Sequence, residues 1–270
     1  YSGAGASHQI GVGQPLGQFY GYVTEGLYQV SDFDYDPTTQ KYTLKEGIPY
    51  HGDKASIQPG YWKFKNVDGS EDNLITENDK TVIGNASPNF YGGINNSFAY
   101  KNFDLSIFLT YSYGGEVLNA TKLTNTKTAL TNKNVLAIAS ETNRWVTINN
   151  DGNIITDPEE LATVNAGKTV ACFDDNGSNN TYIHSWAIED ASFLKLSNVT
   201  LGYTFPKRII NKIGLSKLRV YATGNNLFTW SPYTGFDPEV STMSSPLTPG
   251  VDFGAYPRSR SFVFGINVSF

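Results

Sequence analysis

The chain has 270 residues, which is enough for one large all-β unit. Aromatic residues make up 14% of it and charged residues only 17%, below the share of about 25% in ordinary globular proteins. A net charge of −5 without any Lys/Arg run argues against nucleic acid as a partner, and a single cysteine, Cys172, excludes an internal disulfide framework.

The chain begins at Tyr1, without Met or a charged and then apolar leader, so we expect an internal start, as in a fragment or a processed piece. No apolar run approaches the roughly 18 residues that a membrane helix needs. If the protein enters a membrane, it must therefore do so as strands.

Alternation of apolar and polar residues predicts the first strands. Residues 19–28 are Tyr-rich and extended, with no clear facing. Residues 89–100 and Phe103–Tyr113 alternate, and Lys101-Asn102 between them has the length and composition of a hairpin turn. Between these strands and the next, residues 134–143 have moderate helix propensity and predict a short helix.

The later strands follow the same pattern. Residues 192–205 alternate in their second half, but Leu194 and Leu196 fall on the polar side. Residues 218–228 alternate between apolar and polar at first and lose this alternation near Asn225. Residues 261–270 alternate up to a terminal Phe, and ten residues match the roughly 9–11 of a tilted membrane-spanning strand.

The connections between these strands alternate in length. Lys101-Asn102 and residues 206–217 are short, whereas residues 30–88, 114–191 and 229–260 form connections far longer than the usual 4–6 or so. Short turns at one rim and long loops at the other are typical of outer-membrane β-barrels. About six strands are too few to enclose a wide lumen, so the rest of such a barrel would come from outside this chain.

Candidate catalytic residues are few. His8, His51 and His184 have no ligand spacing, and we expect each at the surface or in a loop; Cys172 is expected to be a small loop residue. Adjacent acids such as Glu159-Glu160 point to opposite faces of an extended chain and cannot act as a hydrolase pair. The sequence therefore predicts a protein that is not an enzyme.

Several motifs together resemble one family. They are Gly13-Gln14-Pro15-Leu16-Gly17-Gln18-Phe19-Tyr20-Gly21-Tyr22, Pro59-Gly60-Tyr61-Trp62-Lys63-Phe64, Tyr100-Lys101-Asn102-Phe103-Asp104-Leu105, Glu189-Asp190-Ala191-Ser192-Phe193-Leu194-Lys195-Leu196, Leu201-Gly202-Tyr203-Thr204-Phe205-Pro206, Asn225-Asn226-Leu227-Phe228 and Tyr233-Thr234-Gly235-Phe236-Asp237-Pro238. In this order they resemble the SusC/RagA-type TonB-dependent transporters, over nearly the whole chain.

The resemblance implies that residues 1–270 are the C-terminal part of a large antiparallel transmembrane β-barrel with long extracellular loops, multi-pass in the outer membrane of a Gram-negative bacterium. The plug and the upstream strands would precede Tyr1, and TonB would act through that absent N-terminal part. A SusD-like surface lipoprotein would be the partner, outer-membrane lipid would surround the barrel, and the cargo would be oligosaccharide or oligopeptide. The competing hypotheses are a soluble carbohydrate-binding β-sandwich and, less favoured, a secreted glycosidase domain.

The acidic stretch at residues 66–79 carries oxygen-bearing side chains at alternate positions, a Gly and a later acid, as Ca²⁺ loops do. A structural Ca²⁺ would have as ligands Asp68, Ser70, Asp72 and Asp79. Asn66 replaces the family's first acid, however, and two residues are inserted before Ile75, so a solvated extracellular loop is the favoured reading. No cofactor is expected to be required.

Aromatic residues in or beside the long loops form the other candidate site. Sugar rings pack against aromatic planes, so a substrate or partner surface would comprise Trp62, Trp145, Trp186, Trp230, Tyr233 and Phe236. The alternative for each single tryptophan is an interfacial belt or loop packing.

Overall fold

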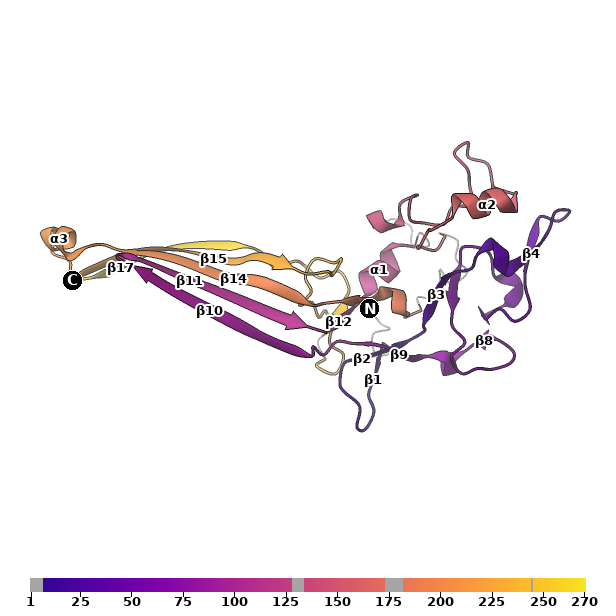
Figure 1. Ribbon diagram of the computed structural model, residues 1–270, viewed down its shortest axis with the longest axis horizontal. Coiled ribbons are helices and arrows are strands. Elements are labelled where there is room, and N and C mark those ends of the chain that lie inside the picture. Colours follow the sequence, from indigo (N-terminus) through magenta and orange to yellow (C-terminus); the bar gives the residue numbers. More distant parts are fainter. Residues whose placement is uncertain (1–6, 128–133, 173–181, 244) are drawn as a thin grey trace. The chain divides into compact units, whose positions relative to one another are not determined.

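Figure 1 shows the computed structural model of the chain, which describes residues 7–127, 134–172, 182–243 and 245–270. The chain divides into two compact units. The loop unit comprises Tyr1–Asn85, Leu118–Ile188 and Met243–Phe253, and the sheet unit comprises Ala86–Val117, Glu189–Thr242 and Gly254–Phe270. Most of the regular structure is strand, which confirms the all-β class. Within the described ranges, no helix is long and apolar enough to span a membrane.

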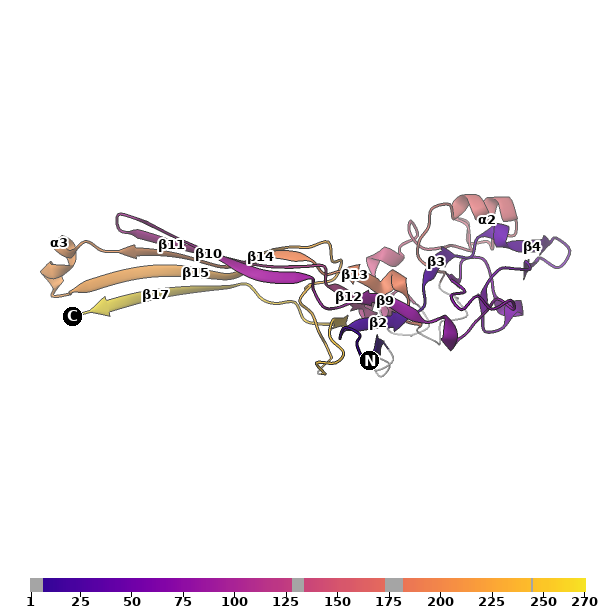
Figure 2. The ribbon, with the colours of Figure 1, turned by 60° about the horizontal axis from the view of Figure 1, so that its bottom comes forward.

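The sheet unit contains one antiparallel sheet whose strands pair in chain order (Figures 1 and 2). The strands are β10 (Phe90–Tyr100), β11 (Phe103–Tyr113), β14 (Phe193–Thr204), β15 (Lys217–Trp230) and β17 (Ser261–Ser269). The predicted strands are confirmed to within two residues at each end. Lys101, at a φ of 52°, makes the predicted turn between β10 and β11, and α3 (Lys207–Ile210) with the 3-10 helix η7 (Asn211–Ile213) fills the connection between β14 and β15.

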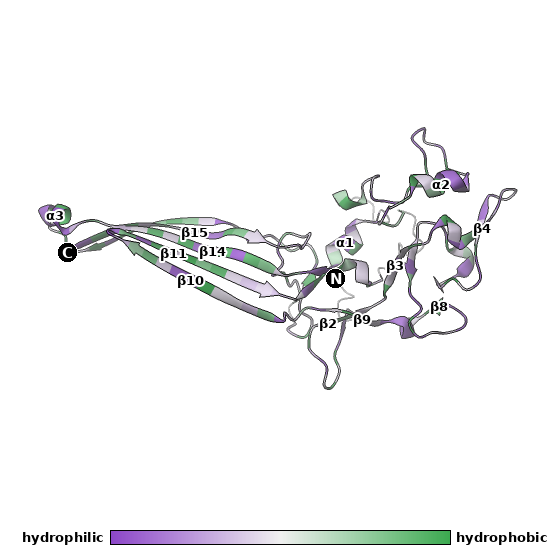
Figure 3. Cartoon of the chain, in the orientation of Figure 1, coloured by the Kyte–Doolittle hydropathy of each residue, from purple (hydrophilic) through white to green (hydrophobic). Residues whose placement is uncertain are grey.

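The sheet has one apolar face and one polar face, and the register sets both. One row across the apolar face contains Phe98, Leu105, Leu201, Ala222 and Phe264. The polar and apolar positions alternate along each strand in Figure 3. Phe264 is 80% exposed, so no other part of the described chain covers this face there. The predicted alternation is therefore confirmed, and its apolar side lies open.

Aromatic side chains concentrate at both ends of the apolar face. At the end with the short connections, the rings of Phe103 and Tyr203 lie 4.8 Å apart between centroids. At the opposite end, Phe90 stacks on Tyr113 at 5.1 Å, and Trp230 lies at the end of β15. The rows between these groups combine aliphatic residues, such as Ile107 and Val199, with further phenylalanines, such as Phe98 and Phe264. An apolar band with aromatic residues at both margins is what the strands of a membrane-spanning barrel present to lipid.

Irregular pairing explains why apolar and polar residues do not alternate strictly along the sequences of β14 and β15. The register of β14 shifts at Ser197, so that Leu194 and Leu196 lie on the same face as Val199 and beyond. The β15 strand has its irregularity opposite, where Asn226 takes a φ of 52°. A β-bulge inserts a residue into one strand and reverses the alternation beyond it. The prediction that Leu194 and Leu196 fall on the polar side is therefore wrong.

The polar face carries an ion pair that lies flat across β14. Arg219 on β15 donates through Nε to Asp104 on β11, at 3.0 Å. Gly202 lies between them, and a Cβ at that position would come within 2.4–2.5 Å of both side chains. The glycine therefore makes room for an ion pair between strands that do not pair with each other.

The loop unit is built from short strands paired over long sequence distances. Its small sheets have the orders β1-β2-β9, β3-β7, β4-β5 and β6-β8. Their bounds are β1 (His8–Gln9), β2 (Gln18–Gly21), β3 (Thr24–Leu27), β4 (Phe33–Asp36), β5 (Lys41–Leu44), β6 (Tyr50–His51), β7 (Trp62–Phe64), β8 (Leu74–Ile75) and β9 (Thr81–Asn85). The strand β16 (Val251–Asp252) pairs with β12 (Glu116–Asn119), and β12 and β13 (Ile188–Asp190) span the unit boundary in the sequence.

Helices in the loop unit are short. They are α1 (Ala120–Asn125), α2 (Pro158–Val164) and the 3-10 helices η2 (Val30–Asp32), η3 (Lys54–Ser56), η4 (Glu77–Asp79), η5 (Ala137–Ala139) and η6 (Ser185–Ala187). The helix predicted for residues 134–143 is wrong, because only the single 3-10 turn η5 forms there. Helix α2 has a stronger start signal, since Asp157 caps the amide of Glu159 and Pro158 opens the helix.

The core of the loop unit is rich in aromatic side chains. Phe64, Trp145 and Tyr28 are each at most 1% exposed. They belong to two neighbouring buried clusters that share the partly buried Tyr42 and Cys172 at their margins. Large rings bury much apolar area per residue, which lets two-to-five-residue strands hold a fold.

Candidate functional site

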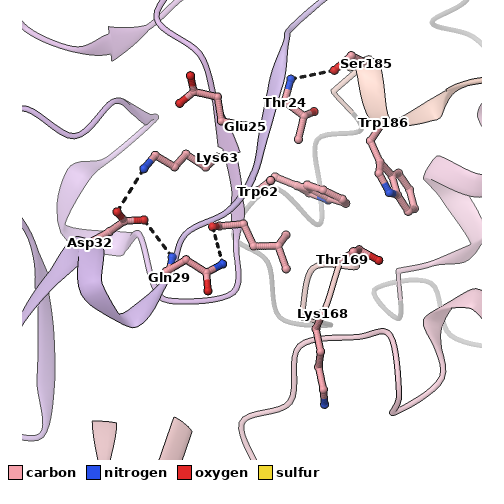
Figure 4. A pocket seen from close by; sticks show the side chains of 12 residues that line it. Thr24, Glu25, Gln29, Asp32, Trp62, Lys63, Lys168, Thr169, Ser185 and Trp186 are labelled. Atoms are coloured by element: carbon pink, nitrogen blue, oxygen red, sulfur yellow. Dashed lines mark hydrogen bonds and ion pairs between the residues drawn. The ribbon is translucent and has the colours of Figure 1, made fainter. Parts of the chain in front are cut away.

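Two of the predicted aromatic residues meet at one pocket in the loop unit. Trp62, from β7, and Trp186, from η6, line a cavity of about 480 Å³ (Figure 4). Their ring centroids are 4.9 Å apart with an angle of 48° between the planes. Trp62 is only 6% exposed, whereas Trp186 is half-buried and offers more of its ring to the pocket. The structure therefore brings together two of the six predicted residues.

Polar contacts hold the two tryptophans in place. The backbone amide of Thr24 donates to Oγ of Ser185 at 2.9 Å, which fixes η6 beside β3. The ammonium of Lys122 lies 4.1 Å from the centre of a Trp186 ring and donates to the carbonyl of Trp186 at 3.0 Å. A cation over an indole face is attracted by the ring quadrupole. Lys122 thus fixes both the ring and the backbone carbonyl of Trp186.

Charged side chains form the other wall of the pocket. Lys63 pairs with Asp32 at 3.2 Å, and the second carboxylate oxygen of Asp32 accepts from the amide of Gln29 at 3.0 Å. Both members of the pair are largely buried. Figure 4 shows this pair on the same side of the pocket as the exposed Glu25. Sequence reasoning missed Lys63 and Asp32, since a lone Lys beside a predicted Trp carries no signal without its distant partner.

Two histidines of the loop unit are buried, so neither lies at the surface, although both fall within the long connections expected from the sequence. His184 is 2% exposed and His51 is 6% exposed. The His184 ring lies 4.8 Å from Trp62, and its Nδ1 is 2.7 Å from the hydroxyl of Thr24. Burial lowers the pKa of His184 to about 3 and that of His51 to about 4, with Lys127 adding to both effects. Each ring is therefore neutral at physiological pH and acts as an aromatic packing element.

The other predicted aromatic residues lie elsewhere. Trp145 is 1% exposed and packs on Gly60 in the loop-unit core. In the sheet unit, Trp230 lies on the apolar face beside Phe228, and Tyr233 is buried with Val117 and Ala191. Phe236, in contrast, is 80% exposed. Of the sheet-unit candidates, Phe236 and Trp230 are exposed, and Trp230 belongs to the apolar face of the sheet.

The acidic stretch closes on itself through its own backbone. Asp79 is fully buried, and its carboxylate accepts from the amides of Val67 and Thr76, both at 2.8 Å, and of Asp68 at 3.3 Å. The carboxylates of Asp68 and Asp72 each accept from an amide two residues further on.

Ca²⁺ takes six to eight oxygen ligands, about 2.3–2.6 Å away. In the part of the chain that the structure describes, no group of three or more His, Cys, Asp or Glu side chains is placed to hold a metal ion. The oxygens of Asp79 already serve backbone amides, so the arrangement of the predicted ligands does not support a Ca²⁺ site.

Known proteins with similar sequences are TonB-dependent receptors. TonB-dependent receptor P3 of Formosa agariphila is 32% identical over 263 residues, which cover 96% of this chain and 22% of that protein. TonB-dependent receptor SusC of Bacteroides thetaiotaomicron is 28% identical over 206 residues, which cover 76% of this chain and 17% of SusC. No family model matches.

The solved structure of the RagAB peptide transporter has the same fold over 94% of this chain and 23% of that chain, with 20% identity and a TM-score of 0.58. The resemblance to the SusC/RagA-type TonB-dependent transporters is confirmed. The relatives are named as receptors and transporters, which confirms that the chain is not an enzyme. The chain spans about a quarter or less of the length of these relatives.

Proposed function

We propose that this chain is the C-terminal part of the barrel of an outer-membrane nutrient importer. Its five-stranded sheet would be a segment of the wall, with the apolar face towards lipid and the polar face towards the lumen. The loop unit would be extracellular. The observation that carries the proposal is the exposed apolar face, which is apolar along its length and has aromatic residues at both ends.

The two free edges of the sheet support a wall segment that continues beyond this chain. Within the described residues, β10 pairs only with β11, and β17 pairs only with β15. Each edge leaves a row of backbone N–H and C=O groups without ladder partners. In hydrocarbon, such groups need partners, and only a closed barrel supplies them. Upstream strands of the same polypeptide would pair with both edges.

The complete protein would take up oligosaccharides, or oligopeptides, together with a SusD-like surface lipoprotein. TonB would supply energy through the plug and N-terminal part that precede this chain. The likeness to receptors of the SusC type supports the partnership, and the RagAB structure belongs to a peptide transporter. The pocket of Trp62 and Trp186 would contribute an aromatic contact for cargo at the extracellular mouth.

A soluble carbohydrate-binding β-sandwich is the alternative. In a sandwich, the apolar face of one sheet packs about 10 Å from a second sheet and becomes its core. Here Phe262, Phe264 and Ile266 are 67%, 80% and 68% exposed. No observation in the described structure favours the sandwich.

The proposal is tested with the full-length protein in a bacterium that lacks its own copy. We expect the protein in the outer-membrane fraction, and we expect uptake of fluorescently labelled oligosaccharides or oligopeptides that stops when TonB is deleted. The control is a strain with the SusD-like partner deleted, in which uptake falls while the receptor remains in the membrane. Recovery of the protein in the soluble fraction, or uptake that does not depend on TonB, would contradict the proposal.

A further inference from the structure

A second and larger cavity lies in the loop unit, outside the pocket of Trp62 and Trp186. Its volume is about 1130 Å³. The β4–β5 hairpin contributes Tyr35 and Tyr42 to the wall, and residues 141–164 contribute most of the remainder. A volume of this size exceeds the roughly 300–1,000 Å³ of common small-ligand pockets, so it can hold several linked units of an oligomer.

Backbone pairing places two basic side chains together at this cavity. Arg144 forms a parallel bridge with Val170, and the amides of Thr169 and Val170 both donate to the carbonyl of Asn143 at 3.0 Å. The segments before and after Trp145 and Val170 therefore run side by side. Arg144 and Lys168 line the cavity from these two segments.

The ammonium of Lys168 has an unfavourable environment. Burial lowers the pKa of Lys168, and the charge of Arg144 lowers it further, while Glu141 acts in the opposite direction on both. None of the ion pairs among the described residues involves Lys168. Figure 4 shows its amine pointing away from Trp62 and Trp186. A half-buried cation beside a second cation gains stability when an anion binds.

The rest of the wall suits sugar rings better than a peptide. Tyr35 and Tyr42 are half-buried, and their rings lie 4.8 Å apart, so they offer aromatic surface for the C–H faces of a pyranose. Neutral amide and hydroxyl side chains line the same cavity, together with the carboxylates of Glu141 and Glu160. The neutral set comprises Gln40, Gln58, Thr142, Thr147, Asn149, Asn150 and Thr156. Such groups donate to and accept from sugar hydroxyls in either direction.

We propose that this cavity binds a short acidic oligosaccharide, with a ring carboxylate at Lys168 and Arg144 and with sugar rings against Tyr35 and Tyr42. The inference rests on the proposed import function, because it names a cargo class for the same extracellular region. It adds a second binding position, which shares Lys168 with the pocket of Trp62 and Trp186.

The test is direct binding to the purified full-length receptor, measured by calorimetry. The probes are an oligogalacturonate, a neutral oligoglucan of equal length and an oligoglutamate peptide. We expect the oligogalacturonate to bind tightest and to weaken as salt rises, because screening reduces the attraction of its carboxylate. We expect Lys168→Gln to weaken this binding about fivefold to tenfold, which matches a partly buried ion pair.

Lys41→Gln is the matched control, since it removes the same charge from an exposed position on β5 that does not line the cavity. It should bind like the wild type. Equal affinity for the neutral glucan, tighter binding of the peptide, no binding of the oligogalacturonate or an unaffected Lys168→Gln variant would each overturn the inference. If the Lys168→Gln variant does not fold, the salt dependence of oligogalacturonate binding to the wild type replaces it as the test. Binding without TonB-dependent uptake would instead refute the import function and leave this inference standing.

Discussion

Ile107 and Ser106 are neighbours on β11 that test which face of the sheet meets lipid. Ile107 lies on the apolar face, in register with Asn96 on one side and Val199 on the other. Ser106 lies on the polar face, where its hydroxyl donates to the amide oxygen of Asn95 at 3.2 Å. The same substitution, to arginine, therefore places a charge in hydrocarbon at one position and in the lumen at the next.

The magnitude follows from where Ile107 lies along the strand. It is four residues from Phe103 and six from Tyr113, the aromatic residues that end β11. At a rise of about 3.3 Å per residue and a tilt of about 45°, it lies about 9 Å and about 14 Å from the two aromatic levels. An arginine this near the bilayer midplane costs about 2–4 kcal/mol, so Ile107→Arg should lower the free energy of unfolding by that amount. Ser106→Arg should cost less than about 1 kcal/mol.

The assay is reversible unfolding of the full-length receptor in lipid vesicles by denaturant, followed by tryptophan fluorescence. The comparison of the two variants removes the cost of a larger side chain, since both introduce arginine. Ile107→Leu, which keeps an apolar side chain, should leave the midpoint unchanged. Equal losses from Ile107→Arg and Ser106→Arg would refute the assignment of the faces.

Two further outcomes concern the loop unit of the full-length receptor. Asp79→Ala should destabilise the acidic loop by about 3 kcal/mol, because three backbone amides lose their acceptor, and limited proteolysis should detect the opening. Asp72→Ala is the control: it removes one hydrogen bond from an exposed side chain and should cost less than about 1 kcal/mol. If both variants were destabilised equally, and a chelator destabilised the wild type by the same amount, the loop would instead hold a Ca²⁺. Lowering the pH from 7 to 5 should cost about 2 kcal/mol for each of His184 and His51, since the unfolded rings take up a proton near pH 6.5 and the folded rings only near pH 3 and pH 4. This stability is nearly complete at pH 7 and declines as the pH falls below about 6.5; a denaturant midpoint that is the same at pH 7 and pH 5 would contradict the burial of these rings.

The sheet unit was largely predictable, because its strands pair with their neighbours in the chain. Alternation along 11 residues predicted both ends of β11 correctly. The turn at Lys101 followed from the two-residue connection between β10 and β11. The exceptions have local causes. Ser197 and Asn226 lie at the register shifts, and neither has a side chain that signals a bulge. Sequence alternation cannot show a phase reversal when the residue that causes it is an ordinary polar one.

The loop unit was not predictable in the same way. Its strands are two to five residues long, too short for a periodicity to stand out. Several of them pair with distant partners: β6 pairs with β8 in parallel, and Tyr22 bridges to His184. Burial of His184 depends on these distant partners. The sequence therefore indicated histidines at the surface or in loops, and it could not show that the fold would bury His184 and His51 as neutral packing residues.

The four tryptophans show that the residues packed around a side chain decide whether it can form part of a site, and that its residue type alone does not. All four lie in or beside a long connection, and nothing in the sequence distinguishes one from another. Trp186 has Lys122 near its ring and also lines a cavity, so it is the tryptophan best placed to contact a ligand. Trp145 packs on Gly60 without access to solvent, and Trp230 continues the alternation of β15 onto the apolar face. Because a side chain can recognise a ligand only where its own packing leaves a face open, the candidate site follows from long-range pairing.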